Sequence, residues 1–349
     1  LYSMVDKEFL ITELRPSLLG TSPFEQVIKK VELLHPSLKH NQLYHKLIHI
    51  KQCINEYNCS DLGEGENLYI HLTEEMMSVA SAKHALQVDL KTGTEKVHLN
   101  NYIKQDIEKA GEILSRLSFR KRGSDHMEQY YNDFLEIYGY YSEVPLLELL
   151  DSGLGLGAPP TYLHPPSLKQ LNSDNKNMER DFILSEWVTN CLASRTSILE
   201  LTEEMIEKLE QENNDPVDAP DSFDIYFTVA SESQESIDRK DYKLIIGPNG
   251  GSFSAGKTFG RFTDILGNDT LNHLKQINSL EKELNPNAIF AEVSYLPSSS
   301  RVANVMLAPS IREYEIPIGA NSSKDNSHTL SLSDLVVGAS SGRLYLKSK

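Results

Sequence analysis

The sequence predicts a large mixed α+β domain, with helices concentrated in the first two thirds and strands in the last third. Apolar residues recur at helical spacing through much of the first 211 residues, and short β-branched runs gather after residue 220. No internal repeat is visible. The 349 residues, of which 39% are hydrophobic, are sufficient to bury a sizeable core.

The helices of the first two thirds follow from this spacing. Residues 6–58 are expected to be helical, most clearly in 24–34 and 43–54, where apolar side chains repeat every three or four positions. Two amphipathic helices and then two further helices are predicted at 100–117, 125–138, 179–194 and 202–211.

Strands are predicted mainly after residue 220, with two earlier exceptions. Residues 68–72 alternate apolar and polar after a Gly- and Glu-rich turn, and 85–90 precede a Lys-Thr-Gly turn. The later strands are expected at 223–230, 244–246, 288–296, 314–318 and 344–346. Residues 153–166 are rich in Gly and Pro and predict a long irregular segment, which in compact domains usually carries function or covers something.

Composition and charge narrow the class of protein. The net charge of −16 argues against a general nucleic-acid-binding protein, whose usual feature is a basic face. No apolar run reaches the 18 or so residues of a membrane helix, and no signal peptide is recognised at the start. The three cysteines form no disulfide framework, so a reducing cytoplasm is the expected location.

One dense basic cluster follows a predicted helix. It comprises Arg116 and, after Phe119, Arg120, Lys121 and Arg122. Cations at a helix C-terminus are favoured by the helix dipole, which is a structural explanation. A local patch that contacts phosphate groups is the alternative.

Gly251–Thr258 reads Gly-Ser-Phe-Ser-Ala-Gly-Lys-Thr and matches the phosphate-binding P-loop pattern. The apolar run before it suits the strand that feeds such a loop. Two features disfavour this interpretation. Gly260 weakens the helix that should open at Lys257, and the later apolar run 288–296 lacks a terminal Asp for a metal. A P-loop NTPase therefore remains an alternative function.

One predicted helix carries residues that could bind a metal. His45, His49 and Cys53 follow one another at intervals of four residues on a predicted helix, and Cys59 could supply a fourth ligand. Apolar residues throughout this helix give it a packing role, and its histidines alternate with lysines as on a solvated face. The sequence alone therefore predicts no metal site.

Several sequence blocks, taken in order, carry more information than any single motif. They are Phe9–Gly20, Leu86–Leu90, Phe134–Gly139, Glu143–Asp151, Gly153–Pro159, Asp241–Ser252, Gly256–Phe262, Arg301–Met306 and Leu332–Gly338. Together they resemble the class I lanthipeptide (lantibiotic) dehydratases over nearly the whole chain. The resemblance places the chain in the central part of the N-terminal glutamylation domain. It implies that residues 1–20 are the tail of a leader-peptide-binding subdomain and 21–349 the glutamylation core, with a weak internal boundary at 211–220.

The resemblance implies an activity. Glutamate would be transferred from glutamyl-tRNA to Ser or Thr hydroxyls of a ribosomal precursor peptide, before elimination to dehydroamino acids. No bound cofactor is implied, and glutamyl-tRNA is the co-substrate. An aminoacyl-tRNA-dependent peptide ligase of the same domain type and a non-catalytic peptide-binding scaffold remain alternatives. We expect the 349 residues alone to be inactive, because parts of the family's pattern are missing from them.

The resemblance also indicates residues and partners. Asp89 and Arg261 match positions that the family uses in glutamylation, so they are the predicted catalytic residues. Arg301, Asn304 and the basic residues Arg120, Lys121 and Arg122 are the predicted contacts to substrate or tRNA. The expected partners are tRNA(Glu), the precursor peptide, a lanthionine cyclase and a second copy of the chain. The expected location is cytoplasmic, with peripheral attachment to the inner face of the membrane as a further expectation.

Overall fold

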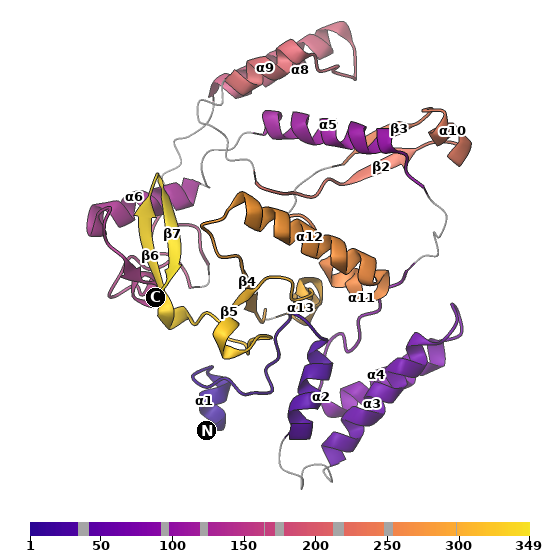
Figure 1. The fold of residues 1–349 in the computed structure, drawn as a ribbon, viewed down its shortest axis with the longest axis vertical. Coiled ribbons are helices and arrows are strands. Elements are labelled where there is room, and N and C mark those ends of the chain that lie inside the picture. The colour runs from indigo at the N-terminus through magenta and orange to yellow at the C-terminus, as the bar shows by residue number, and fades with distance from the viewer. Residues whose placement is uncertain are drawn as a thin grey trace. The chain divides into compact units, whose positions relative to one another are not determined.

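The computed structural model describes residues 1–33, 42–91, 98–118, 125–163, 165–171, 178–211, 220–247, 254–297 and 299–349 (Figure 1). About 49% of the described residues are helical and 12% are in strands, which confirms the predicted α+β class. The chain divides into two compact units. Unit 1 comprises Leu1–Gly93 and Ala255–Ser331, and unit 2 comprises Thr94–Ser254 and Leu332–Lys349. Each unit therefore joins segments that are distant in the sequence.

Unit 1 is mainly helical. Its helices are α1 (Tyr2–Asp6), α2 (Pro23–Leu33), α3 (Gln42–Asn58), α4 (Glu66–Val79), α11 (Thr263–Leu266), α12 (Asn268–Leu284) and α13 (Ser300–Met306). The helices α3 and α4 pack side by side as a hairpin (Figure 1). Their shared core consists of Ile50, Cys53 and Leu72, which are all buried. Burial, followed by the charges of Glu56 and Glu75, raises the pKa of the Cys53 thiol.

Unit 1 also contains a two-stranded parallel sheet. Strand β4 (Ala291–Tyr295) pairs with β5 (Tyr314–Ile318), with Val293 opposite Ile316. Parallel strands need a long crossover connection, and this one contains α13. The strands bury Glu292, Ser294 and Glu315, so an unusual number of polar groups lies inside this sheet.

Two predicted strands in unit 1 are wrong. Residues 68–72 lie within α4, because Leu68, Leu72, Met76 and Val79 continue the apolar pattern at helical spacing and Leu72 is buried against α3. Residues 85–90 pair with no strand among the described residues. Leu86 instead packs against the core of the α3–α4 hairpin, which supplies the burial that a sheet would have given.

Four helices of unit 2 confirm predicted helices to within one residue at each end. They are α5 (Asn101–Leu117), α6 (Asp125–Tyr138), α8 (Met178–Ser194) and α9 (Glu203–Gln211). The unit also contains two short helices that were not predicted, α7 (Leu146–Leu150) and α10 (Gln234–Asp238). Arg116, at the end of α5, forms ion pairs with Glu203 at 2.7 Å and Glu210 at 2.9 Å on α9. This member of the basic cluster therefore joins two helices.

Unit 2 has two small antiparallel sheets. Strands β1 (Val144–Pro145), β6 (Leu335–Ser340) and β7 (Arg343–Ser348) form one sheet in the order β1-β6-β7. Strand β2 (Phe227–Ala230) pairs with β3 (Lys243–Ile246) in the other. The predicted strands in both sheets are thereby confirmed with adjusted ends, as are those of β4 and β5.

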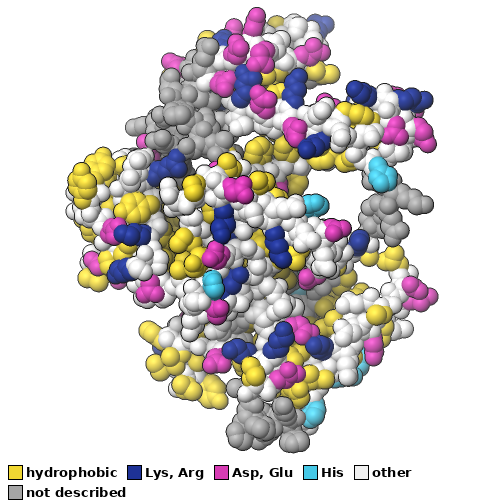
Figure 2. Space-filling model, in the orientation of Figure 1, with side chains coloured by type: hydrophobic (Ala, Val, Ile, Leu, Met, Phe, Trp, Pro, Cys, Tyr) yellow, Lys and Arg dark blue, Asp and Glu magenta, His cyan; other side chains and the backbone are white. Residues whose placement is uncertain are grey.

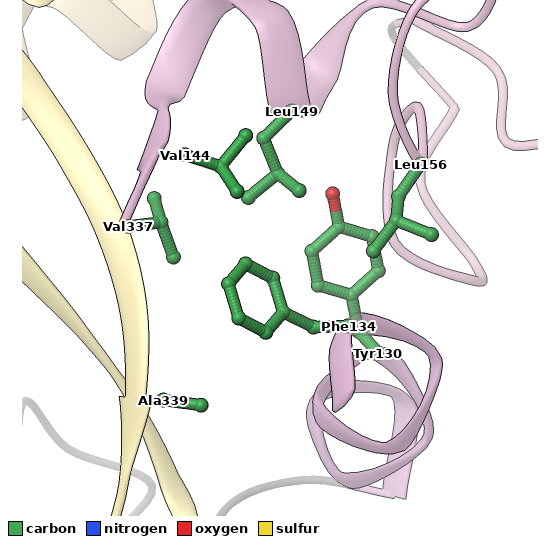
Figure 3. Packing of buried hydrophobic residues seen from close by; sticks show 7 residues of the cluster. All are labelled: Tyr130, Phe134, Val144, Leu149, Leu156, Val337 and Ala339. Atoms are coloured by element: carbon green, nitrogen blue, oxygen red, sulfur yellow. The ribbon is translucent and has the colours of Figure 1, made fainter. Parts of the chain in front are cut away.

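The core of unit 2 explains the Gly-rich block at 153–159. Tyr130 and Phe134 from α6 pack against residues of β1, α7 and β6 (Figure 3). The Tyr130 hydroxyl donates a 2.7 Å hydrogen bond to the carbonyl oxygen of Gly157, which fixes this irregular segment on the core. A Cβ on Gly155 would lie 2.2 Å from the carbonyl oxygen of Glu148, so no other residue fits there.

Among the described residues, no helix is long and apolar enough to cross a membrane.

Candidate functional site

The two residues predicted to be catalytic lie in contact in unit 1. Asp89 belongs to the unpaired segment that follows α4, and Arg261 lies in a 3₁₀ turn, η2 (Gly260–Phe262). Arg261 Nη2 lies 3.1 Å from Asp89 Oδ1, although 172 residues separate them in the sequence. The side chain of Asp89 is 32% exposed and that of Arg261 is 18% exposed, so the carboxylate remains accessible while the guanidinium is mostly covered.

Two neighbours orient this ion pair. Gln87 Nε2 donates a 3.3 Å hydrogen bond to the same Asp89 Oδ1. The guanidinium carbon of Arg261 lies 4.3 Å from the ring centre of Phe262, a cation–π arrangement. Among the described residues, Asp89 Oδ2 accepts no hydrogen bond. Within the described part of the chain, the site thus presents one carboxylate oxygen without a hydrogen bond, beside a guanidinium that is held in place.

The turn that carries Arg261 depends on a glycine, Gly256. Gly256 has φ +83°, and a Cβ there would lie 2.1 Å from Leu274 Cδ2 on α12. The amide of Gly260 donates a 2.9 Å hydrogen bond to the Gly256 carbonyl. Gly256 is therefore required for a tight turn packed against a helix, and this turn sets the direction of Arg261.

The same turn bears on the P-loop interpretation. The Lys257 ammonium forms an ion pair with the carboxylate of Glu292 on β4. Residues 255–259 form a turn, and the first α-helical residue after it is Thr263. A P-loop needs a helix N-terminus at the Lys-Thr pair and a lysine directed to phosphate, so these features disfavour it. Residues 248–253, including the first part of the motif, lie outside the described residues.

A buried arginine centre adjoins Lys257. Arg312 lies 2.5 Å from Glu281 Oε2 and 3.9 Å from Glu292 Oε1. Its Nη1 donates a 2.6 Å hydrogen bond to Asn278 Oδ1, and its guanidinium lies over the ring of Phe290. The three charged side chains are each less than 10% exposed. This centre joins α12 to the sheet and leaves little room for a substrate.

Glu315 is a second buried carboxylate, and its partners are neutral. It accepts five hydrogen bonds, from the hydroxyls of Ser17, Ser294, Ser322 and Ser323 and from the Ser323 amide. Burial acts to raise the pKa of Glu315, but the hydrogen bonds from Ser294, Ser323 and Ser17 outweigh it and hold the pKa below its ordinary value. Glu315 thus joins three segments to β5: the segment that carries Ser17, strand β4, and the segment that carries Ser322 and Ser323.

The structure shows no contact between the remaining predicted site residues and the pair of Asp89 and Arg261 among the described residues. Arg301 is exposed and Asn304 is partly buried on α13, and neither forms a hydrogen bond or ion pair with Asp89 or Arg261. Arg120, Lys121 and Arg122 lie outside the described residues. On the face shown in Figure 2, acidic and basic side chains are interspersed.

Three buried charged residues were not predicted from the sequence: Glu292, Arg312 and Glu315. A detectable signal was present for Glu292, because it is the one acidic residue in the otherwise apolar run 288–293. A charged residue inside a short apolar strand usually has a buried partner. Nothing comparable marks Arg312, which lies in an irregular segment before β5.

Comparisons with known proteins identify the class that this fold and these blocks define. Residues 1–349 match the family model described as lantibiotic dehydratase, N terminus. The chain therefore belongs to the lantibiotic dehydratase N-terminal family, which confirms the resemblance seen in the sequence.

Individual relatives agree with this assignment. The chain is 31% identical to the subtilin biosynthesis protein SpaB of Bacillus subtilis over 96% of its length, and 30% identical to the epidermin biosynthesis protein EpiB of Staphylococcus epidermidis over 99%. It covers 32% and 33% of those proteins, so it spans about a third of the length of the relatives it matches.

A solved structure shows the same fold. The crystal structure of the tRNA-dependent lantibiotic dehydratase MibB from a Microbispora species matches 99% of this chain with a TM-score of 0.83 and 27% identity. The match covers 34% of the MibB chain.

Proposed function

We propose that this chain carries part of the site that transfers glutamate from glutamyl-tRNA to Ser or Thr side chains of a ribosomal precursor peptide. Membership of the lantibiotic dehydratase N-terminal family supports the reaction class. The description of MibB as tRNA-dependent supports an aminoacyl-tRNA donor. The single observation that carries the proposal is the contact between Asp89 and Arg261, across 172 residues of sequence.

The chemistry is an acyl transfer between two oxygen atoms. The hydroxyl oxygen of the acceptor side chain attacks the carbonyl carbon of the glutamyl ester, and the ribose oxygen of the tRNA leaves and takes up a proton. In a later elimination, the glutamate carboxylate leaves from this new ester far more readily than hydroxide would leave from the free side chain. Because the donor ester is already activated, the protein must chiefly position the reactants and stabilise charge at the carbonyl.

Asp89 suits the acceptor side of this reaction. Its Oδ1 is held by Arg261 and Gln87, which leaves Oδ2 free to accept the hydrogen of a Ser or Thr hydroxyl. In this role Asp89 orients the hydroxyl and assists removal of its proton as the new ester bond forms. The one-third exposure of its side chain gives a peptide access to it.

Arg261 suits the donor side. Its guanidinium has five N–H donors, and the contact with Asp89 engages one nitrogen. The remaining donors can hold the glutamyl carboxylate or a phosphate at the tRNA 3′ end, and the planar group fits either anion. The ring of Phe262 restricts its rotation, so less freedom is lost on binding.

The partners follow from this reaction. tRNA(Glu) delivers the donor and the precursor peptide supplies the acceptor, while the exposed Arg301 on α13 is proposed to contact one of them. Asn304, Arg120, Lys121 and Arg122 are retained as further proposed contacts. The site needs no bound cofactor in this scheme.

The test uses the intact native protein that contains these residues. It is mixed with precursor peptide, glutamyl-tRNA synthetase, tRNA(Glu) and radiolabelled glutamate, and label on the peptide is measured. Label is expected with the wild type and is expected to be lost with Asp89→Asn or Arg261→Ala. Glu313→Gln is the matched control, because it removes a comparable surface ion pair with Lys282 elsewhere in unit 1.

Other outcomes would assign the protein differently. Label on the peptide in amide rather than ester linkage would favour the peptide ligase. Absence of label with folded protein and charged tRNA would contradict the proposal. Magnesium-dependent nucleotide binding lost in Lys257→Ala would then favour the P-loop alternative.

A further inference from the structure

Two histidines and a cysteine converge on the α3–α4 hairpin, away from the ion pair of Asp89 and Arg261. His49 and Cys53 lie one turn apart on α3, and His71 faces them from α4. One ligand atom from each of the three residues lies within 4.8 Å of those of the other two. His49 Nε2 and Cys53 Sγ are 3.7 Å apart, and the imidazole rings of His49 and His71 meet edge to face at 6.2 Å.

These separations are close to those of a tetrahedral zinc site. Zn–S and Zn–N bonds of about 2.3 and 2.0–2.1 Å place sulfur and nitrogen ligands about 3.6 Å apart. The separation of His49 and Cys53 already has this value within about 0.1 Å. Both histidines are exposed, so small side-chain rotations can bring His71 to the same distance without moving the helices.

The surroundings favour a cation at this point. Cys53 is buried in the apolar core of the hairpin, while the histidines lie at its solvent-facing edge. The cluster therefore has a closed apolar side and an open polar side. The charges of Glu56 and Glu75 act on Cys53 and add negative potential. Carboxylates near a metal centre commonly hold and orient its histidine ligands.

Packing alone accounts for only part of this arrangement. A buried cysteine behaves as a small apolar residue, which explains Cys53. It does not explain why two imidazoles from different helices each place a nitrogen within 4.8 Å of the thiol sulfur. The neighbouring His45, on the same helix, takes no part in the cluster and instead contacts Tyr44.

We propose that His49, Cys53 and His71 bind a zinc ion that fastens α3 to α4. Two imidazoles and a thiolate form a borderline-soft ligand set suited to Zn²⁺, with water in the fourth position. Binding releases the thiol proton to solvent as the Zn–S bond forms. In the sequence, His45 was the candidate ligand beside His49 and Cys53, and no metal site was predicted. The true third ligand, His71, was hidden because residues 68–72 were predicted to be a strand.

The test measures metal binding by the intact native protein after treatment with a chelator. Co²⁺ is added as a spectroscopic substitute for Zn²⁺, and the thiolate-to-cobalt charge-transfer band is recorded, followed by displacement with Zn²⁺. The variants are Cys53→Ser and His71→Asn. The matched controls are Cys59→Ser, an exposed thiol just after α3, and His45→Asn, an exposed imidazole one turn before His49.

The proposal predicts a charge-transfer band in the wild type and in both controls. In His71→Asn, the affinity for Zn²⁺ should be weakened by more than about 100-fold, because even residues that only orient metal ligands contribute about 10–100-fold. Zinc should raise the melting temperature of the wild type but not of His71→Asn. His71 is exposed, so this variant is expected to fold even where Cys53→Ser does not. A band that persists in His71→Asn, absence of cobalt and zinc binding by the wild type, or binding of copper alone would overturn the proposal.

Discussion

Arg261 and Arg312 both lie in unit 1 and both contact carboxylates, yet they differ in burial and in the number of their partners. Arg312 is 7% exposed and lies between Glu281 and Glu292, with Asn278 as a further partner. Arg261 contacts the single carboxylate of Asp89, which is itself a third exposed. The first arginine has its donors engaged by the fold, whereas the second keeps donors directed to a region that a substrate can reach.

The comparison shows how a charged pair in a site differs from one in a core. A buried pair is costly to desolvate, and the fold tolerates it only when several partners surround it. An accessible pair contributes little to stability, so the contact between Asp89 and Arg261 is not explained by stability alone. Four predictions test this distinction, in order of decreasing expected effect on free energy.

Replacing Arg312 should have the largest effect, and it should be on folding. Arg312→Met leaves Glu281 and Glu292 buried without their shared cation, which is expected to cost about 3–5 kcal/mol of unfolding free energy. Urea denaturation of the purified protein measures this value. A loss below about 1 kcal/mol would show that Arg312 is no structural centre.

Replacing Arg261 should act on the reaction instead. Arg261→Ala is expected to lower the rate of peptide glutamylation by about 10²–10³-fold, the typical effect of losing one group that stabilises developing charge. The double variant Asp89→Arg with Arg261→Asp restores an ion pair but exchanges the two groups. It should stay inactive, and recovered activity would mean that the pair is only a brace.

Glu315 provides an intermediate case with a pH signature. Glu315→Gln places an amide NH₂ against hydroxyl and amide donors, so we expect a loss of about 1–3 kcal/mol near neutral pH. The folded-state pKa of Glu315 is lowered, so its stabilisation is present above the ordinary value of 4.5 and is lost as pH falls through the folded pKa. Unfolding curves recorded at descending pH should therefore converge for wild type and variant. Curves that remain parallel would contradict this account.

The smallest effect on stability is expected at Asp89. Asp89→Asn removes one partly exposed ion pair and should change the unfolding free energy by less than about 1 kcal/mol. The same variant should abolish glutamylation, so a thermal melt and the labelling assay together separate stability from activity. A large loss of stability would place Asp89 with Arg312 as a structural residue.

The sequence predicted well the parts of the fold that depend on local periodicity. The helices α5, α6, α8 and α9 were predicted to within a residue because their apolar faces repeat regularly. Helix α12 was missed, since one of its buried positions is Glu281, whose charge is compensated by Arg312 from a distant segment. Strand β6 was missed because its buried residues do not alternate with exposed ones.

The site could be predicted only in part, and for a related reason. The resemblance to a family indicated Asp89 and Arg261 separately, but their contact depends on packing between segments far apart in the sequence. No periodicity connects the segment after α4 with the turn before α11. The cluster of His49, Cys53 and His71 was missed because its third member could be recognised only after residues 68–72 were known to be helical.

The packing of Leu86 restricts where the Asp89 carboxylate can lie. It packs against the hairpin core, and Asp89 follows it by three residues, which span about 10 Å in extended chain. A carboxylate on so short a tether is confined near the Arg261 guanidinium, at an effective concentration far above that of a freely diffusing anion. The hydrophobic contacts of Leu86 thus help to keep the Asp89 carboxylate near Arg261, with the hairpin as the anchor.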